Sequence, residues 1–112
     1  MTTPRRPPRF DVRWSAEVQI DGRSVTGTTR NLSTGGVCIE IDRPVAEGSL
    51  FALTLFMVED GVEAVGGKAL ELKGTVQWVA EADHGYAVGF RFASLSATQL
   101  AALGQAITTL GE

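Results

Sequence analysis

The residues of this 112-residue chain best suited to chemistry are N-terminal arginines and a polar turn. Arg5, Arg6 and Arg9 form the first group, and the stretch Asn31-Leu32-Ser33-Thr34-Gly35-Gly36 begins 22 positions after Arg9. A guanidinium group forms paired hydrogen bonds with phosphate oxygens or with O6 and N7 of guanine, and it stacks on base planes. An Asn amide can donate and accept hydrogen bonds, a Ser hydroxyl can bind a polar group, and glycine permits close backbone approach. These residue types suit an anionic ligand.

The charge distribution supports a local anion site. The net charge is -3, which argues against a protein that coats nucleic acid with a basic surface. Residues 1–30 carry six arginines against three carboxylates, a net +3, whereas residues 31–112 carry four basic and ten acidic side chains, a net -6. Positive charge is therefore gathered at one end of an acidic domain.

Several functional classes are disfavoured by what the sequence contains. Cys38 and His84 are the single cysteine and histidine, so neither an internal disulfide nor a zinc site is expected. No catalytic set of carboxylates or of Ser, His and Asp can be assembled, so we expect neither an enzyme nor a cofactor, and we expect His84 in a solvated turn. Long apolar runs and a secretory signal are absent, which predicts no membrane insertion and a cytoplasmic location.

The arginines and the turn must be positioned by strands. Apolar residues alternate with polar ones from Phe10 to Ile20, and Asp21-Gly22 then favours a tight hairpin. Gly74 suggests a bulge or a bend, and the acidic, Gly-rich stretch 59–67 suggests a loop. The predicted strands span residues 10–20, 23–30, 37–41, 51–57, 70–80 and 86–92.

The period then changes to that of a helix over 96–110. Ser96-Ala97-Thr98-Gln99 has capping-box spacing, Leu95 and Leu100 are spaced as a hydrophobic staple, and one face carries Leu100, Leu103, Ile107 and Leu110. The predicted fold is mainly β, a six-stranded antiparallel barrel or strongly curled sheet with a C-terminal helix. Residues 1–9 are expected to form a flexible, arginine-bearing arm, and residues 10–110 the domain.

The two motifs together resemble the PilZ domain family. Its signature is Arg-x-x-x-Arg followed, about twenty to thirty residues later, by Asp/Asn-x-Ser-x-x-Gly; Arg5 to Arg9 and Asn31 to Gly36 match both elements. The stretches 74–78 and 85–92 are similar to the late strands of the family, so the resemblance covers about residues 5–110. It implies a six-stranded antiparallel barrel that binds cyclic di-GMP.

The resemblance also assigns roles to residues. It implies that Arg5 and Arg9 bind phosphates and guanine edges with Arg6 as a helper, and that Asn31, Ser33 and Gly36 form the facing turn. Gly35 is an addition to the family pattern that also permits close backbone approach. Ligand binding would order the arm and create a surface for an unidentified effector protein, with motility or exopolysaccharide production among the outputs. The protein would be a monomer or a ligand-dependent dimer.

Four residues close to these motifs have other interpretations. Arg13 lies on the polar face of its strand, so we expect a surface ion pair. Trp78 shares the parity of Leu72 and Val76, which places it in the core, although an aromatic residue here lies close to the ligand in some members of the family. Pro7 and Pro8 stiffen the arm, which either lowers the ordering cost or holds Arg5 too far from Arg9.

Two other functions compete with nucleotide reception. A PilZ-fold adaptor that has lost nucleotide binding would usually lack the arginines or the Ser turn, and this chain has both. A barrel that binds single-stranded DNA or RNA would expose aromatic residues among basic ones, whereas Trp14, Trp78, Phe90 and Phe92 have core parity. The arginine tail and the turn, taken singly, are also what a solubilising terminus and an ordinary loop contain.

Overall fold

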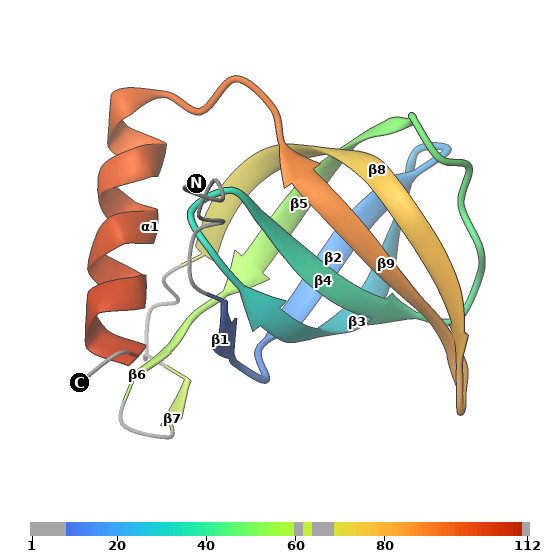
Figure 1. Cartoon of the computed structure of the whole chain (residues 1–112), viewed down its shortest axis with the longest axis horizontal. Helices are drawn as coiled ribbons and strands as arrows, with labels where there is room; N and C mark the ends of the chain where they lie inside the picture. Colours follow the sequence, from blue (N-terminus) through green and yellow to red (C-terminus); the bar gives the residue numbers. More distant parts are fainter. Residues whose placement is uncertain (1–8, 60–61, 64–68, 111–112) are drawn as a thin grey trace, which may run out of the picture.

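Six antiparallel strands close into a barrel, with one helix beside one end of it (Figure 1). The computed structural model describes residues 9–59, 62–63 and 69–110. Around the barrel the strand order is β3-β2-β5-β8-β9-β4, and pairing of β3 with β4 closes it, which confirms the predicted fold class. The elements are β1 (Phe10–Asp11), β2 (Ser15–Ile20), β3 (Arg23–Leu32), β4 (Gly36–Ile41), β5 (Leu50–Phe56), β6 (Val58–Glu59), β7 (Val62–Glu63), β8 (Ala69–Ala82), β9 (Gly85–Phe92) and α1 (Ala97–Leu110).

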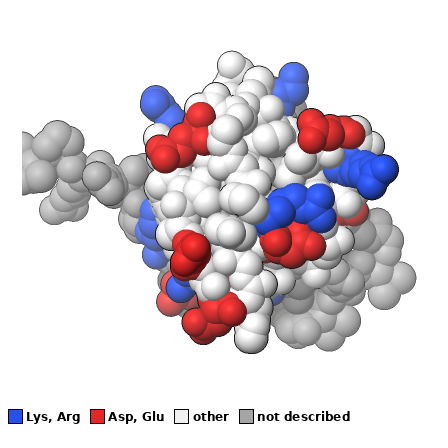
Figure 2. Space-filling view, turned by 90° about the vertical axis from the view of Figure 1, so that its right-hand side faces the viewer, with Lys and Arg blue, Asp and Glu red and all other residues white. Residues whose placement is uncertain are grey.

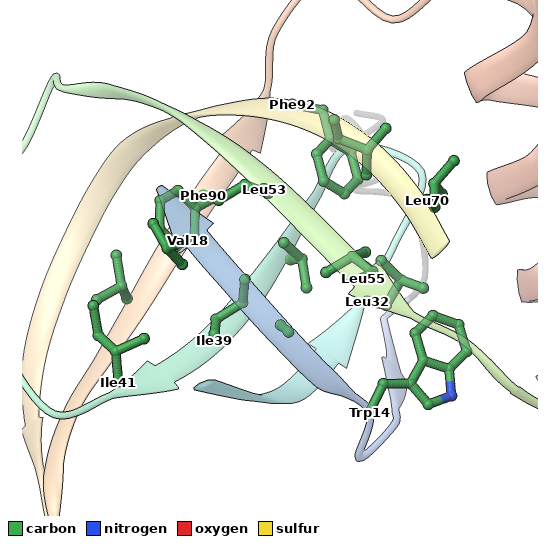
Figure 3. Packing of buried hydrophobic residues seen from close by; sticks show 14 of the residues in the cluster. Trp14, Val18, Leu32, Ile39, Ile41, Leu53, Leu55, Leu70, Phe90 and Phe92 are labelled. Atoms are coloured by element: carbon green, nitrogen blue, oxygen red, sulfur yellow. The ribbon is translucent and has the colours of Figure 1, made fainter. Parts of the chain in front are cut away.

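The barrel interior is filled by apolar side chains from all six strands. Figure 3 shows them pointing toward one another from opposite walls, as the alternation of each strand requires. The tight Asp21-Gly22 turn forms as predicted, with φ of 51° and 78° at its two residues. The labelled core residues are Trp14, Val18, Leu32, Ile39, Ile41, Leu53, Leu55, Leu70, Phe90 and Phe92.

The stretch predicted as one strand over 10–20 is divided into β1 and β2, because residues 12–14 leave the regular ladder. The fully buried hydroxyl of Thr29 bridges the break: it accepts a hydrogen bond from the Trp14 N–H at 2.8 Å and donates one to the Val12 carbonyl at 2.6 Å. The side chain thus satisfies two buried backbone groups. Beyond the break, β1 pairs with the end of β3, Asp11 opposite Asn31, and Arg9 directly precedes β1.

A bulge in β8 changes which side chains face the core. Val76 pairs with Phe90 and Trp78 pairs with Gly89, so Gln77 is the additional residue. The parity is therefore reversed after the bulge: Val79 packs against the core, and Trp78 lies on the outer face with 41% of its surface exposed. The prediction of a core position for Trp78 is wrong for this reason.

Two predictions about loops and bends also need correction. Gly74 lies in regular pairing, and a Cβ there would approach Leu53 Cδ1 to 2.8 Å, so the glycine provides packing space rather than the bulge. Within the predicted loop 59–67, β6 and β7 form a small hairpin with Glu59 opposite Val62. The remaining residues of that loop lie outside the described part of the chain.

The helix begins with the predicted capping box. The Ser96 N–H donates to Gln99 Oε1 at 2.8 Å, and the Gln99 N–H donates to Ser96 Oγ at 3.1 Å. Leu103 is fully buried and Ile107 packs against the core. Leu100 is half exposed, contrary to prediction, because the helix meets the barrel through these later turns; the Leu110 side chain lies outside the description.

Candidate ligand-binding site

The two sequence motifs meet through Arg9 and Asn31. Arg9 Nη1 donates a hydrogen bond to Asn31 Oδ1 at 2.7 Å, across 22 positions of the chain. Arg9 is exposed and Asn31 is half-buried near the end of β3. The amide oxygen thereby orients a guanidinium group whose other N–H groups can bind an anion.

The turn between β3 and β4 is organised by Ser33. Its side chain is buried, and its Oγ accepts hydrogen bonds from the N–H groups of Gly35 at 3.1 Å and Gly36 at 3.2 Å. The Ser33 N–H donates to the Gly36 carbonyl at 2.9 Å, and the Gly35 carbonyl accepts from the Phe92 N–H at 3.0 Å. Ser33 therefore fixes the backbone of the turn, and its hydroxyl is already engaged there.

Gly36 occupies a position that no other residue fits without movement. A Cβ there would collide with the carbonyl oxygen of Phe90 on the adjacent strand. The close approach of β4 to β9 at this point thus depends on glycine. The last residue of the sequence motif is therefore required by the packing of two strands, whatever the turn binds.

Next to this turn lies a patch of the outer barrel wall, which we call the shelf and define by Asn31, Cys38, Gly89 and Trp78. The strand registers place these residues in one row across β3, β4, β9 and β8. The Trp78 indole lies directly against Gly89, where any Cβ would collide with it. The nitrogen-containing ring of the indole thus covers the barrel wall at Gly89, while the side chain keeps 41% of its surface exposed.

Cys38 forms the floor of the shelf. It lies on the outward parity of β4, as predicted, but it is only 2% exposed. Burial raises the pKa of its thiol, which agrees with the expectation that it is not a reactive cysteine. No group of potential metal ligands occurs among the described residues.

Charged side chains surround the shelf in mixed sign. Glu40 Oε1 lies 3.2 Å from Arg30 Nε and 3.6 Å from Arg13 Nη1, so the predicted surface ion pair of Arg13 is present. At the barrel end that faces away from α1, basic and acidic groups are interspersed among the residues in view (Figure 2). The only histidine, His84, lies exposed in the β8–β9 turn, as expected.

Comparison with known proteins assigns the chain to a family. The model of the PilZ domain matches residues 3–109, almost the whole chain. The chain belongs to the PilZ domain family. PilZ domains are cyclic di-GMP receptor and adaptor domains, and no catalytic family is indicated.

Solved PilZ structures share the fold of this chain at low sequence identity. The PilZ domain with c-di-GMP of YcgR from Escherichia coli has a TM-score of 0.76 at 18% identity, covering 97% of this chain and 92% of that one. YcgR in complex with c-di-GMP gives 0.77 at 20% identity, with 96% and 46% covered. The Bacillus subtilis inhibitor of motility MotI/DgrA gives 0.74 at 16%, with 93% and 49% covered. The chain thus spans about half the length of YcgR and MotI.

No curated protein matches the chain. Within the described residues, no helix has the length and apolar character needed to cross a membrane.

The structure brings together five of the seven residues predicted for the PilZ site. Arg9 contacts Asn31, and Ser33, Gly35 and Gly36 form the adjacent turn. Arg5 and Arg6 lie outside the described residues. Whether these residues bind a ligand stays a prediction.

Trp78 is the neighbour of the site that sequence reasoning placed elsewhere. Strict alternation along β8 hides it, because the bulge at Gln77 reverses the parity. A signal was nevertheless present in the adjacent strand β9, where the outward-facing position 89 holds a glycine, which leaves room for an indole on the outer face.

Proposed function

We propose that this PilZ domain is a receptor for cyclic di-GMP that binds the ligand on the shelf and signals to a partner protein. The hydrogen bond between Arg9 and Asn31 is the observation that carries the proposal, because it joins the two halves of the motif in one place. A ligand with two phosphates and two guanines needs cationic donors beside a flat apolar surface. Arg9 and the exposed Trp78 provide these two features.

The proposed roles follow from the contacts of each residue. Arg9, with Arg5 and Arg6 from the arm, binds phosphates and guanine edges, and Asn31 orients Arg9. Ser33 holds the turn, and Gly36 lets β4 and β9 approach each other. A guanine stacks on the Trp78 indole, an interaction that alanine substitution would weaken by about 1–3 kcal/mol.

Signalling would come from the arm, residues 1–9. We propose that the bound ligand fixes this arm against the turn, so that arm and ligand together form a surface for an effector protein. The proposed output is regulation of motility or of exopolysaccharide production. The proposed location of the protein is the cytoplasm. The ordering would make the affinity for the partner depend on the ligand.

Titration calorimetry with cyclic di-GMP tests the proposal. Loss of charge-assisted hydrogen bonds costs about 1.5–3 kcal/mol, so Arg9→Ala should raise Kd roughly 10- to 150-fold. Arg23→Ala is the matched control, because Arg23 is an exposed arginine at the hairpin end of β3. The control should bind like the wild type.

Two results would contradict this function. Absence of binding by the wild type would favour a PilZ adaptor that does not bind nucleotide. Equal affinities of Arg9→Ala and Arg23→Ala for cyclic di-GMP would show that the ligand does not bind on the shelf.

A further inference from the structure

Arg30 occupies an irregular position at the edge of the shelf. Thr29 pairs with Ile39 and Asn31 pairs with Cys38, so Arg30 is the additional residue of a bulge in β3. A bulge changes the direction of a side chain relative to the regular strand. Arg30 directly precedes Asn31, the residue that accepts a hydrogen bond from Arg9.

The Arg30 side chain is paired with Glu40. Its Nε lies 3.2 Å from Glu40 Oε1, and the same oxygen lies 3.6 Å from Nη1 of Arg13. The Arg30 and Glu40 side chains are 47% and 36% exposed. Ion pairs this accessible to water are weak, whereas a phosphate forms charge-assisted, often bidentate, bonds with a guanidinium. A phosphate can therefore displace Glu40 from Arg30.

Charged side chains beside the shelf influence the Cys38 thiol. Burial is the largest influence on the Cys38 thiol and raises its pKa; Arg30 lowers it, Glu40 raises it and Arg9 lowers it. These three side chains thus lie close enough to one thiol to affect its ionisation. Arg30 and Glu40 border the surface on which the ligand is proposed to bind.

We propose that Arg30 is a further ligand-contacting arginine and that Glu40 competes with the ligand phosphate for it. The inference rests on the proposed function, since it concerns the same site. Without ligand, Glu40 neutralises Arg30. With ligand, the phosphate takes the Arg30 guanidinium and the carboxylate stays with Arg13, its second partner. Glu40 therefore sets the affinity of the site and prevents weaker anions from occupying it.

The test is calorimetric titration of cyclic di-GMP into Arg30→Ala, Glu40→Gln and the double variant. Arg30→Ala should weaken binding by about tenfold or more, because a charge-assisted contact is lost. Glu40→Gln should tighten binding by about two- to fivefold, the ratio expected when an exposed ion pair no longer has to be broken. In the Arg30→Ala background, Glu40→Gln should give no gain.

The controls separate this inference from general charge effects and from misfolding. Arg23→Ala removes the same charge from the other end of the same strand and should leave Kd unchanged. Arg30→Gln keeps part of the aliphatic stem and should weaken binding as Arg30→Ala does, with thermal unfolding midpoints equal to that of the wild type. Equal effects of Arg30→Ala and Arg23→Ala would refute the contact with Arg30.

The remaining outcomes are equally decisive. A gain from Glu40→Gln that persists without Arg30 would refute the competition, because Glu40 would then act on the ligand directly. If the wild type binds and Arg9→Ala weakens binding while the Arg30 variants do not, the proposed function stands and the further inference fails. If the wild type does not bind cyclic di-GMP, both fail.

Discussion

Substitution of Thr29 tests the bend that places Arg9 beside Asn31. In Thr29→Val the side-chain shape is kept, but the Trp14 N–H loses its acceptor at 2.8 Å and the Val12 carbonyl loses its donor at 2.6 Å. Each unsatisfied buried group costs about 1–3 kcal/mol. A gain of up to roughly 1 kcal/mol from the added methyl group offsets part of this cost. For the two groups together, less this offset, the free energy of unfolding should therefore fall by about 1–5 kcal/mol.

Urea unfolding measures this difference against two comparison variants. Thr28→Val makes the same change one position earlier, where the side chain is exposed, and should alter the stability by less than about 0.5 kcal/mol. Thr29→Ser keeps the hydroxyl and removes one buried methyl group, at a cost of about 0.5–1.5 kcal/mol. If Thr29→Val is no more destabilising than Thr29→Ser, the hydroxyl bridge does not stabilise the bend.

Three further expectations concern Gly36, Gly104 and Cys38. Gly36→Ala should destabilise the domain by about 1–3 kcal/mol, because the new methyl group meets the Phe90 carbonyl, and urea unfolding measures the loss. Gly104→Ala, the same change inside α1 where a Cβ meets nothing within 4 Å, should instead stabilise by up to about 1 kcal/mol. Destabilisation by Gly104→Ala, or stabilisation by Gly36→Ala, would contradict the corresponding expectation. Because burial raises the pKa of Cys38 above 9.0, the unfolded thiol ionises first as the pH rises, and the free energy of unfolding should decline above about pH 9. Cys38→Ala should lack this component of the decline, and identical pH profiles would contradict the buried neutral thiol.

Local sequence rules predicted the elements where one strand or turn decides the outcome. Alternation located five of the six barrel strands, Asp21-Gly22 located the hairpin that leads into the strand over 23–30, and Ser96 with Gln99 located the start of the helix. These signals depend on residues close together in the chain. They predicted the fold class for that reason.

Features that depend on contacts between strands were not predictable in this way. The break in the first predicted strand lies where the Thr29 hydroxyl, from a neighbouring strand, forms hydrogen bonds with the backbone of Val12 and Trp14. The bulge at Gln77 places Trp78 on the outer face. The alternation of residues along β8 does not indicate this bulge.

The candidate site was predictable as a set of residue types but not as a surface. The spacing of Arg9 and Asn31 indicated a shared site, and the structure places them in contact. The engagement of Ser33 within its own turn and the pairing of Arg30 with Glu40 follow from side-chain geometry alone.

The two tryptophans allow the most direct test that cyclic di-GMP binds the shelf. Trp14 is 4% exposed in the core and Trp78 is 41% exposed on the shelf, so a nitrogen-15 correlation spectrum contains one indole signal from each environment. Titration with cyclic di-GMP should shift the Trp78 indole and the Gly35 and Gly36 amide signals in a saturable way while the Trp14 indole stays in place. An unchanged Trp78 signal at saturation, or shifts confined to other parts of the barrel, would contradict the proposed site.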